Sequence, residues 1–226
     1  MIAIDGPAGA GKTTISRLLA NRLGWTYIDT GAMYRAVAVK AHEKGINPND
    51  ENGLESICRD IKIAFKTTKK GSRIFVDGKD CSEKIRESYV GDITSRISAK
   101  PNVRKAMVRL QQEMGRNGDV VMEGRDIGTV VFPDAQFKFY LDASPETRGK
   151  RRYLELDATG EKTSLENIIS DIKKRDERDS SRTHSPLKKA KDAVYIDTSD
   201  MTTEEVVEKM MEVIRGVKGQ GARVMV

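Results

Sequence analysis

Cysteine, histidine and aromatic residues are scarce in this sequence. Its 226 residues include two cysteines, two histidines and one tryptophan, and aromatic side chains make up 5%. Cys58 and Cys81 lack the close spacing of metal ligands, and His42 and His184 are far apart, so no Cys/His metal site can be drawn. Unpaired cysteines fit a reducing compartment, and the few aromatic residues show no pattern for stacking on nucleic-acid bases.

Long apolar runs are also missing. No run approaches the roughly 20 residues of a membrane-spanning helix. The opening "MIAID" goes straight into a strand-like segment, with neither a basic leader nor the apolar block of a signal peptide. We therefore expect a cytoplasmic protein, and we expect it to be a monomer.

Charge is abundant and its balance is basic. Charged residues make up 33% of the chain and hydrophobic residues 38%, with a formal net charge of +6. This balance favours an anionic partner, but it does not distinguish a nucleotide from a nucleic acid or an acidic surface. The length suits one domain with an insert.

Short apolar segments alternate with helical patterns along the chain. Five segments are expected to be strands: "MIAID", "TYID", "DVVME", "FKFYLD" and "AVYID". Helices are expected at 12–23 and 31–45, after Ser144-Pro145 as N-cap and first helical residue, and after Thr202 and Glu205, which have capping-box spacing. The alternation predicts an α/β fold with a parallel five-stranded sheet flanked by helices.

One segment breaks this alternation. "IKIAFK" alternates with period two and is followed by "TTKKGS" and "RIFVDGKD", which predicts a small antiparallel β insert at about 60–92. The basic "KTTKKGSR" is expected to be a solvated turn, with a nucleic-acid patch as the alternative. The remaining domain is expected to span 1–218, followed by a frayed tail at 219–226.

A glycine-rich loop indicates the chemistry. "GPAGAGKT" matches G-x-x-x-x-G-K-[ST] and lies between a predicted strand and a predicted helix, as a P-loop requires. Backbone N–H groups and the helix N-terminus cradle a polyphosphate, Lys12 supplies charge for the β- and γ-phosphates, and the Thr13 hydroxyl is placed for Mg²⁺. The predicted ATP-binding residues are Gly6, Pro7, Ala8, Gly9, Ala10, Gly11, Lys12, Thr13 and Thr14.

An arginine-rich helix end suggests a second anion site. In "KKRDERDSSR", one helical face carries Arg175, Arg178, Asp179 and Arg182. The apolar stripe of Leu165, Ile168, Ile169 and Ile172 continues at the same steps into positions 175, 176 and 179, so charges replace apolar residues on an inward line. Inward arginines suggest a bound phosphate; the alternative is a solvated helix end.

A third basic cluster follows the "FKFYLD" segment. Arg148, Arg151 and Arg152 are spaced to share one helical face. In a phosphotransferase such residues could cover the transferred group, so we interpret 148–182 as a lid region, with a solvated face as the alternative.

The motifs together resemble the bacterial-type cytidylate kinases, which belong to the P-loop nucleoside monophosphate kinases. The resemblance runs from Met1 to about Arg215 and rests on "IDGPAGAGKTT", "YIDTGAMYRA", "EGRDIGTVVFPDA", "LDAS" and "KKRDERDSSR". It implies a P-loop NTPase-type fold, with the β insert in the acceptor-binding region. It also implies transfer of the γ-phosphate of ATP to CMP or dCMP, in pyrimidine nucleotide metabolism, with Mg²⁺.

The resemblance further implies a role for individual residues. Arg35, Arg125 and Arg182 would hold the acceptor phosphate beside Thr30 and Tyr34. Arg175 and Asp179 would meet the ribose hydroxyls, and Arg178 would reach the transferred group. Ser95, Arg104 and Asp126 would recognise the base. Thr30 stands where serine is familiar in the family and Glu123 where aspartate is frequent; Glu123 could orient a Mg²⁺-bound water. The implied catalytic residues are Lys12, Arg125, Arg178 and Arg182.

Two alternatives stay open. One is a P-loop kinase for another small acceptor, such as UMP or shikimate. The other is a basic nucleotide-dependent module that binds nucleic acid and transfers no phosphate to free nucleotides. A switch GTPase should carry N-K-x-D for guanine, and the sequence has none.

Overall fold

The computed structural model describes residues 1–68, 71–116, 118–158, 160 and 163–221. The chain divides into two compact units. The first unit comprises residues 1–26 and 119–226, and the second comprises 27–118. Within the described residues, no helix combines the length and the apolarity needed to cross a bilayer.

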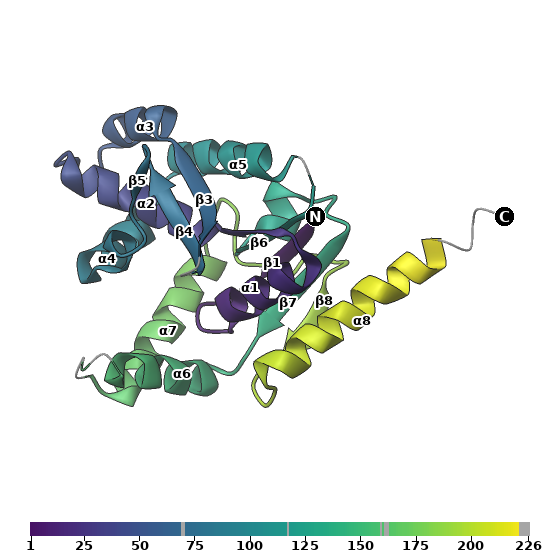
Figure 1. The fold of residues 1–226 in the computed structure, drawn as a ribbon. Coiled ribbons are helices and arrows are strands. Elements are labelled where there is room, and N and C mark those ends of the chain that lie inside the picture. Colours follow the sequence, from purple (N-terminus) through teal and green to yellow (C-terminus); the bar gives the residue numbers. More distant parts are fainter. Residues whose placement is uncertain (69–70, 117, 159, 161–162, 222–226) are drawn as a thin grey trace. The chain divides into compact units, whose positions relative to one another are not determined.

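A parallel five-stranded sheet forms the core of the fold and confirms the predicted class. Its order is β2-β6-β1-β7-β8 (Figure 1), with bounds β1 Ile2–Asp5, β2 Thr26–Asp29, β6 Val120–Gly124, β7 Phe137–Asp142 and β8 Val194–Asp197. Strands β1 and β6 are buried along their whole length because they lie inside the sheet. All five strands occur where the sequence predicted them.

The register brings the carboxyl ends of the strands to one edge. Asp5 pairs with Gly124 of β6, and Asp142 pairs with Asp197 of β8. Loops that leave this edge of a parallel sheet form ligand sites in open α/β folds. The glycine-rich loop leaves the sheet there, directly after the central strand β1.

Helices α1 (Lys12–Leu23) and α8 (Thr203–Gly221) pack against each other (Figure 1). Helix α1 buries Ile15 and Leu19 and ends at Gly24, which takes the left-handed conformation with φ 68°. The predicted capping box begins α8: Thr202 N donates to Glu205 Oε2 at 2.7 Å, and Glu205 N donates to Thr202 Oγ1 at 3.2 Å. Part of the predicted tail is helical, since α8 reaches Gly221, and 222–226 lie outside the described residues.

Helices α6 (Pro145–Asp157) and α7 (Leu165–Ser180) lie next to each other in Figure 1 and pack closely. Ser144 caps α6 as predicted, with its hydroxyl accepting from Thr147 N at 3.1 Å. Gly149 allows the close approach, because a Cβ there would lie 2.4 Å from Ile169 Cγ1. The two helices therefore meet through Gly149 and Ile169.

The second unit contains the predicted antiparallel insert. Strands β3 (Ile63–Thr68), β4 (Gly71–Val76) and β5 (Lys79–Asp80) form a three-stranded sheet, in which Ile63 pairs with Val76. Lys69 and Lys70 of the predicted basic turn lie outside the described residues. The insert belongs to a larger unit with α2 (Thr30–Glu43) and three helices that the sequence analysis did not assign: α3 (Glu51–Asp60), α4 (Ser88–Ile97) and α5 (Pro101–Gly115).

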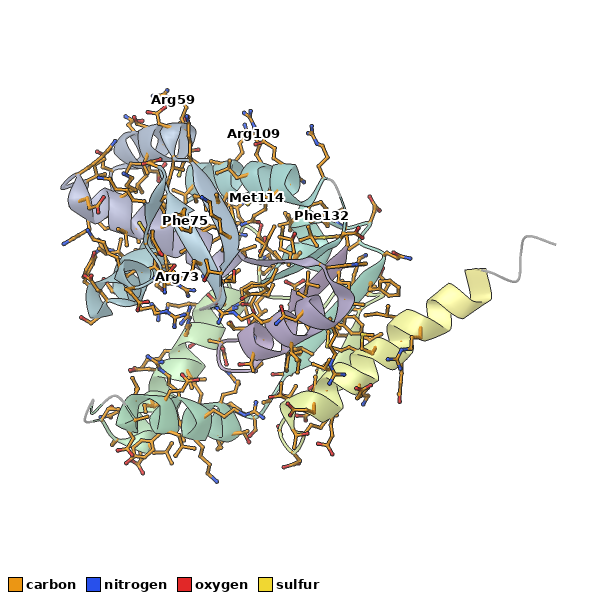
Figure 2. The ribbon with its side chains drawn as sticks, viewed as in Figure 1. Arg59, Arg73, Phe75, Arg109, Met114 and Phe132 are labelled. Carbon is orange, nitrogen blue, oxygen red and sulfur yellow. The ribbon has the colours of Figure 1, made fainter. Side chains whose placement is uncertain are left out.

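Helices α2, α3, α4 and α5 contribute the core of the second unit. Leu54 and Ile57 of α3 are buried, as are Val103 and Met107 of α5. On the outer sides of the same two helices, Arg59 and Arg109 point away from the protein (Figure 2), with side chains 72% and 82% exposed. This division into apolar and charged faces fixes how the helices pack.

Candidate active site

The loop of residues 6–11 can be built only with glycine at key positions. Gly6, Gly9 and Gly11 have φ values of 146°, 79° and 83°. A Cβ on Gly6 would lie 1.9 Å from the carbonyl oxygen of Leu141, and one on Gly9 would lie 3.0 Å from Arg148 Cβ. The loop therefore lies tightly against the rest of the first unit, with a backbone that other residues rarely adopt.

The start of α1 is suited to an anion. Its N-cap is Gly11, which has no side chain, and its first turn contains no acidic residue. By contrast, α2 and α6 are capped by the side chains of Asp29 and Ser144. The first N–H groups of α1 have no partner within the helix, and the helix dipole adds positive potential there. The geometry fits a polyphosphate at this helix N-terminus.

Lys12 lies against its own loop. Its Nζ donates to the carbonyl oxygen of Pro7 at 2.5 Å, and the residue is 7% exposed. Burial, together with the charge of Arg125, lowers the pKa of Lys12 to about 7. The ammonium group is thus held at the loop where a polyphosphate charge would favour its protonated form.

The pKa of Lys12 predicts that nucleotide binding takes up a proton. At pH 8 a group with a pKa of about 7 is mostly neutral, and a bound polyphosphate would raise this pKa and protonate it. We expect binding of ATP with magnesium at pH 8 to take up close to one proton. Calorimetry in two buffers with different ionisation enthalpies measures this number. At pH 6, where Lys12 is already charged, its uptake should disappear; equal heats in both buffers at pH 8 would contradict the assignment.

Thr13 and Glu123 form a pair of oxygen ligands beside the loop. Thr13 Oγ1 donates to Glu123 Oε1 at 2.7 Å, and Glu123 is 3% exposed at the end of β6. Mg²⁺ is commonly held by one or two protein oxygens, with phosphate oxygens and water completing its shell. The described residues contain no group of three or more His, Cys, Asp or Glu that could hold a metal by themselves. The pair fits a metal that arrives with a nucleotide.

Asp5 fixes the turn that follows β6. Its two carboxylate oxygens accept from the backbone N–H groups of Ile127 and Gly128 at 2.8 and 2.7 Å. Burial raises the pKa of Asp5 to about 6, although these two hydrogen bonds oppose the rise. The clamped turn, which continues as a π-helix over Ile127–Val131, follows directly after Arg125 and Asp126. Asp5 was not among the predicted site residues. The sequence signal that points to it is an acidic residue at the end of a buried strand, directly before a P-loop.

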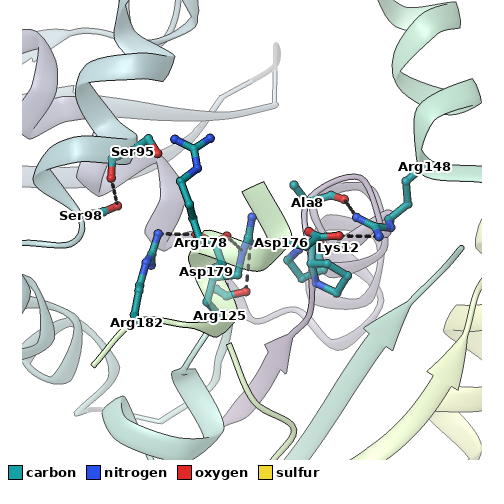
Figure 3. A network of polar contacts seen from close by, with 12 residues as sticks. Ala8, Lys12, Ser95, Ser98, Arg125, Arg148, Asp176, Arg178, Asp179 and Arg182 are labelled. Carbon is teal, nitrogen blue, oxygen red and sulfur yellow. Dashed lines mark hydrogen bonds and ion pairs between the residues drawn. The ribbon is translucent and has the colours of Figure 1, made fainter. Parts of the chain in front are cut away.

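A buried aspartate holds two arginines together. Arg125 Nε donates to Asp179 Oδ2 at 3.0 Å, and Arg182 pairs with Asp179 Oδ1 (Figure 3). Asp179 is 4% exposed. Burial acts to raise the pKa of Asp179, but the charges of Arg125, Arg182 and Arg175 hold it below its ordinary value. One carboxylate among three guanidinium groups leaves this region positive, as a phosphate site requires.

The predicted line of inward charges needs a correction. The buried side of α7 runs through Ile168, Ile172, Asp176 and Asp179, and Arg175 is exposed. Steps of four, four and three residues keep these positions on one line, while position 175 falls to its side. The inward charges are therefore acidic, and each is paired with an arginine from another segment. Asp179 holds Arg125 and Arg182 directly.

The second unit contains five further predicted acceptor residues: Thr30, Tyr34, Arg35, Ser95 and Arg104. Thr30 is 4% exposed at the start of α2, and Arg35 pairs with Asp29 at 3.0 Å. The Arg104 guanidinium lies 5.7 Å from the centre of the Tyr34 ring and donates to the carbonyl oxygen of Ser98 at 3.3 Å. In turn, Ser98 Oγ donates to the carbonyl oxygen of Ser95 at 3.2 Å. This unit thus gathers aromatic, hydroxyl and guanidinium groups on α2, α4 and α5.

Comparison with known proteins decides the family. The family model for cytidylate kinase matches residues 2–216. The chain belongs to the cytidylate kinase family. It is 50% identical over 221 residues to the cytidylate kinase of Citrifermentans bemidjiense, covering 98% of this chain and 95% of the relative. The cytidylate kinase of Geobacter sulfurreducens is 50% identical over 215 residues, covering 95% and 92%.

Within this cytidylate kinase family member, several predicted roles stay predictions. Arg178 is exposed at the end of α7, where its Nε donates to the carbonyl oxygen of Lys174 at 3.3 Å. Asp126 is 6% exposed, and its backbone carbonyl accepts from Val130 N at 2.9 Å. These positions are compatible with transfer and base recognition but do not test them.

The interpretation of the α6 arginines as a lid changes. Arg148 is 3% exposed and contacts the glycine-rich loop, with its NH1 3.1 Å from the carbonyl oxygen of Ala8 (Figure 3). Arg151 donates to Thr198 Oγ1 at 3.1 Å. Arg152 pairs with Glu155 at 3.0 Å on the exposed side of the helix. The three arginines therefore do not share one exposed face, and a lid region at 148–182 stays a prediction.

Proposed function

We propose that this protein transfers the γ-phosphate of ATP to CMP or dCMP, forming CDP or dCDP. Membership of the cytidylate kinase family supports the substrates. The observation that carries the proposal is chemical: the first unit holds two separate groups suited to phosphate. One is the glycine-rich loop with Lys12, and the other is the arginine pair fixed by Asp179. A phosphotransferase needs one such group for the donor and one for the acceptor.

On the donor side, the N–H groups of residues 6–13 would bind the phosphates and Lys12 would neutralise charge that develops during transfer. Thr13 and Glu123 would hold Mg²⁺, which supplies further charge neutralisation on the phosphate oxygens. The tight fit of Gly6 against Leu141 keeps this loop in place before the nucleotide binds. The residues on the donor side thus position the ATP phosphates and neutralise their charge.

On the acceptor side, the attacking group needs no general base. The second pKa of a phosphate monoester is about 6, so CMP is mostly a dianion at pH 7. Arg125 and Arg182 would orient that dianion and Arg178 would reach the transferred group, while Arg175 and Asp179 would meet the ribose. In the second unit, Thr30, Tyr34 and Arg35 would assist with the phosphate. Catalysis would rest on alignment and charge neutralisation.

A substrate panel tests the proposal. ADP formation is followed with ATP and each of CMP, dCMP, UMP, AMP, GMP and shikimate. We expect rapid turnover with CMP and dCMP. Efficient use of UMP or shikimate instead would support a kinase for another acceptor. Tight, salt-sensitive binding of RNA with no transfer to any monophosphate would support the nucleic-acid module.

Base choice gives a further prediction. Cytosine offers an amino donor beside a ring-nitrogen acceptor, and uracil reverses both. Ionised Asp126 can only accept and Arg104 can only donate, so uracil would leave both groups mismatched. We expect kcat/KM to be higher for CMP than for UMP by about 10²-fold or more. A buried mismatch can reduce kcat/KM by about 10⁴-fold, and we expect a smaller effect here because water can replace part of the lost contact.

Asp126→Asn tests which residue sets this preference. The amide can donate, so the variant should narrow the gap between CMP and UMP in kcat/KM. Ser95→Ala makes the corresponding test for Ser95, the third residue that is predicted to contact the base. If wild-type protein uses UMP as well as CMP, or if Asp126→Asn loses both substrates in equal proportion, these residues do not recognise the base. A monomeric state and a cytoplasmic location stay predictions.

A further inference from the structure

Four carbonyl groups of the glycine-rich loop have hydrogen-bond partners within the first unit. The Pro7 carbonyl accepts from Lys12 Nζ at 2.5 Å, and the Gly11 carbonyl accepts from Ile15 N at 3.1 Å. The Ala8 carbonyl accepts from Arg148 NH1 at 3.1 Å, and the Ala10 carbonyl lies 3.3 Å from the Thr198 hydroxyl. A loop that binds phosphate must turn its N–H groups toward the ligand. Holding the carbonyls elsewhere fixes that orientation.

All three nitrogens of the Arg148 guanidinium have partners within the first unit. Its Nε donates to the carbonyl oxygen of Ala143 at 2.8 Å, and NH1 donates to Ala8. Its NH2 lies 2.6 Å from Asp176 Oδ2 on α7, and the Arg148 side chain is 4% exposed. The stem of Arg148 also packs close to Gly9, where an added Cβ would lie 3.0 Å from Arg148 Cβ. These three partners hold the guanidinium of Arg148 within the first unit.

Arg151, one helical turn later, acts on the same loop through Thr198. Its NH1 donates to Thr198 Oγ1 at 3.1 Å, and its NH2 pairs with the Thr198 carbonyl. Thr198 is 1% exposed and its N–H donates to the carbonyl oxygen of Asp142 at 2.8 Å. The Thr198 hydroxyl lies 3.0 Å from the Asp142 carbonyl oxygen and 3.3 Å from the Ala10 carbonyl oxygen, and it can donate its one hydrogen to either of them. Arg151 and the end of β7 therefore hold this hydroxyl next to Ala10.

We propose that Arg148 and Arg151 are positioning residues for the donor-binding loop. They hold the Ala8 and Ala10 carbonyls outward, directly or through Thr198, so that the loop N–H groups face the donor phosphates. Asp176 fixes Arg148, and Gly149 brings α6 close enough to α7 for this ion pair. The inference rests on the proposed function only in taking the loop as the site of the donor phosphates.

The test measures binding of ATP and of inorganic tripolyphosphate, which has no adenosine, by calorimetry. Arg148→Lys keeps the charge but cannot reach three partners with one point charge. Because a hydrogen bond to a charged group contributes about 1.5–3 kcal/mol, we expect both probes to bind about 10-fold or more weakly. Arg152→Ala is the matched control, since Arg152 follows in the same helix but is exposed, and it should bind both probes as wild type does.

Two further variants check the mechanism. Asp176→Asn should weaken tripolyphosphate binding, and its combination with Arg148→Lys should be no worse than Arg148→Lys alone, because both changes release the same guanidinium. Thr198→Val replaces the hydroxyl, which contacts Ala10, Asp142 and Arg151, by a methyl group and should also weaken the binding of both probes. This variant tests the proposal even if Arg148→Lys fails to fold.

The outcomes are distinguishable. If Arg148→Lys weakens ATP but leaves tripolyphosphate unchanged, Arg148 contacts the adenosine and the proposal is wrong. Wild-type affinity for both probes in Arg148→Lys or in Thr198→Val also overturns it. If wild-type protein binds neither probe, the proposed function fails instead, since the loop then holds no donor phosphates.

Discussion

Replacing Lys12 with alanine should reduce kcat by about 10³-fold while the protein stays folded. Removal of one preorganised charge or donor from a site where charge develops commonly costs 10²–10³-fold in turnover. Lys12 is 7% exposed, and the Pro7 carbonyl holds its Nζ at the loop. The effect should appear in kcat for every acceptor, because the lost contact is to the transferred phosphate.

Stability provides the control for this variant. Burial lowers the pKa of Lys12 to about 7, which means that the fold disfavours its charge when no nucleotide is bound. Its removal should therefore leave the melting temperature equal to or above that of wild type. The assay combines a thermal melt with ADP formation from ATP and CMP. A Lys12→Ala protein with near-normal turnover would falsify the assignment of the loop.

Removing Arg182 should raise KM for CMP by about 10²-fold and change KM for ATP little. Truncating one member of a buried charge cluster costs about 2–5 kcal/mol when the ligand carries the opposite charge. Arg182 and Arg125 share the two oxygens of Asp179, whose side chain is 5% exposed, so each arginine is held in one place before the substrate binds. Arg182→Ala loses one phosphate contact and leaves Asp179 with less compensation.

Asp179→Asn tests the hold on the two arginines together with the ribose contact proposed for Asp179. The amide keeps the shape but weakens the hold on both arginines, so KM for CMP should rise by a smaller factor than in Arg182→Ala. Arg152→Ala again serves as the control, since that arginine is exposed and pairs only locally with Glu155. If Arg182→Ala changes KM for ATP and for CMP equally, or changes neither, the 173–182 segment does not bind the acceptor. The alternative interpretation of this segment as a solvated helix end would then hold.

Local signals in the sequence predicted much of the fold. The strands, the glycine-rich loop, the Ser144 cap and the Thr202–Glu205 capping box each depend on residues close together in the chain. Helices α3, α4 and α5 were not predicted, although Asp50 before α3 and Pro101 at the start of α5 are helix-start signals. The β insert was predicted correctly from its period, but not the helices that share its unit.

The partners of the site residues were harder to predict because they lie far apart in the chain. Arg148 reaches Ala8 across 140 positions, and Asp5 reaches Gly128 across 123. Helical spacing grouped Arg148, Arg151 and Arg152 on one face, yet each has a different environment once α6 packs on α7. Likewise, the spacing predicted that positions 175, 176 and 179 all point inward, whereas packing turns only Asp176 and Asp179 inward and leaves Arg175 exposed. Which member of a charged face is buried depends on tertiary packing.

The most direct measurement follows the phosphate itself. ATP labelled in its γ-phosphate is incubated with CMP and the protein, and the products are separated. We expect the label to appear in CDP, in the same amount as ADP is formed, and in dCDP when dCMP is the acceptor. Label found only in inorganic phosphate, or in the product of another acceptor while CMP stays unlabelled, would contradict it.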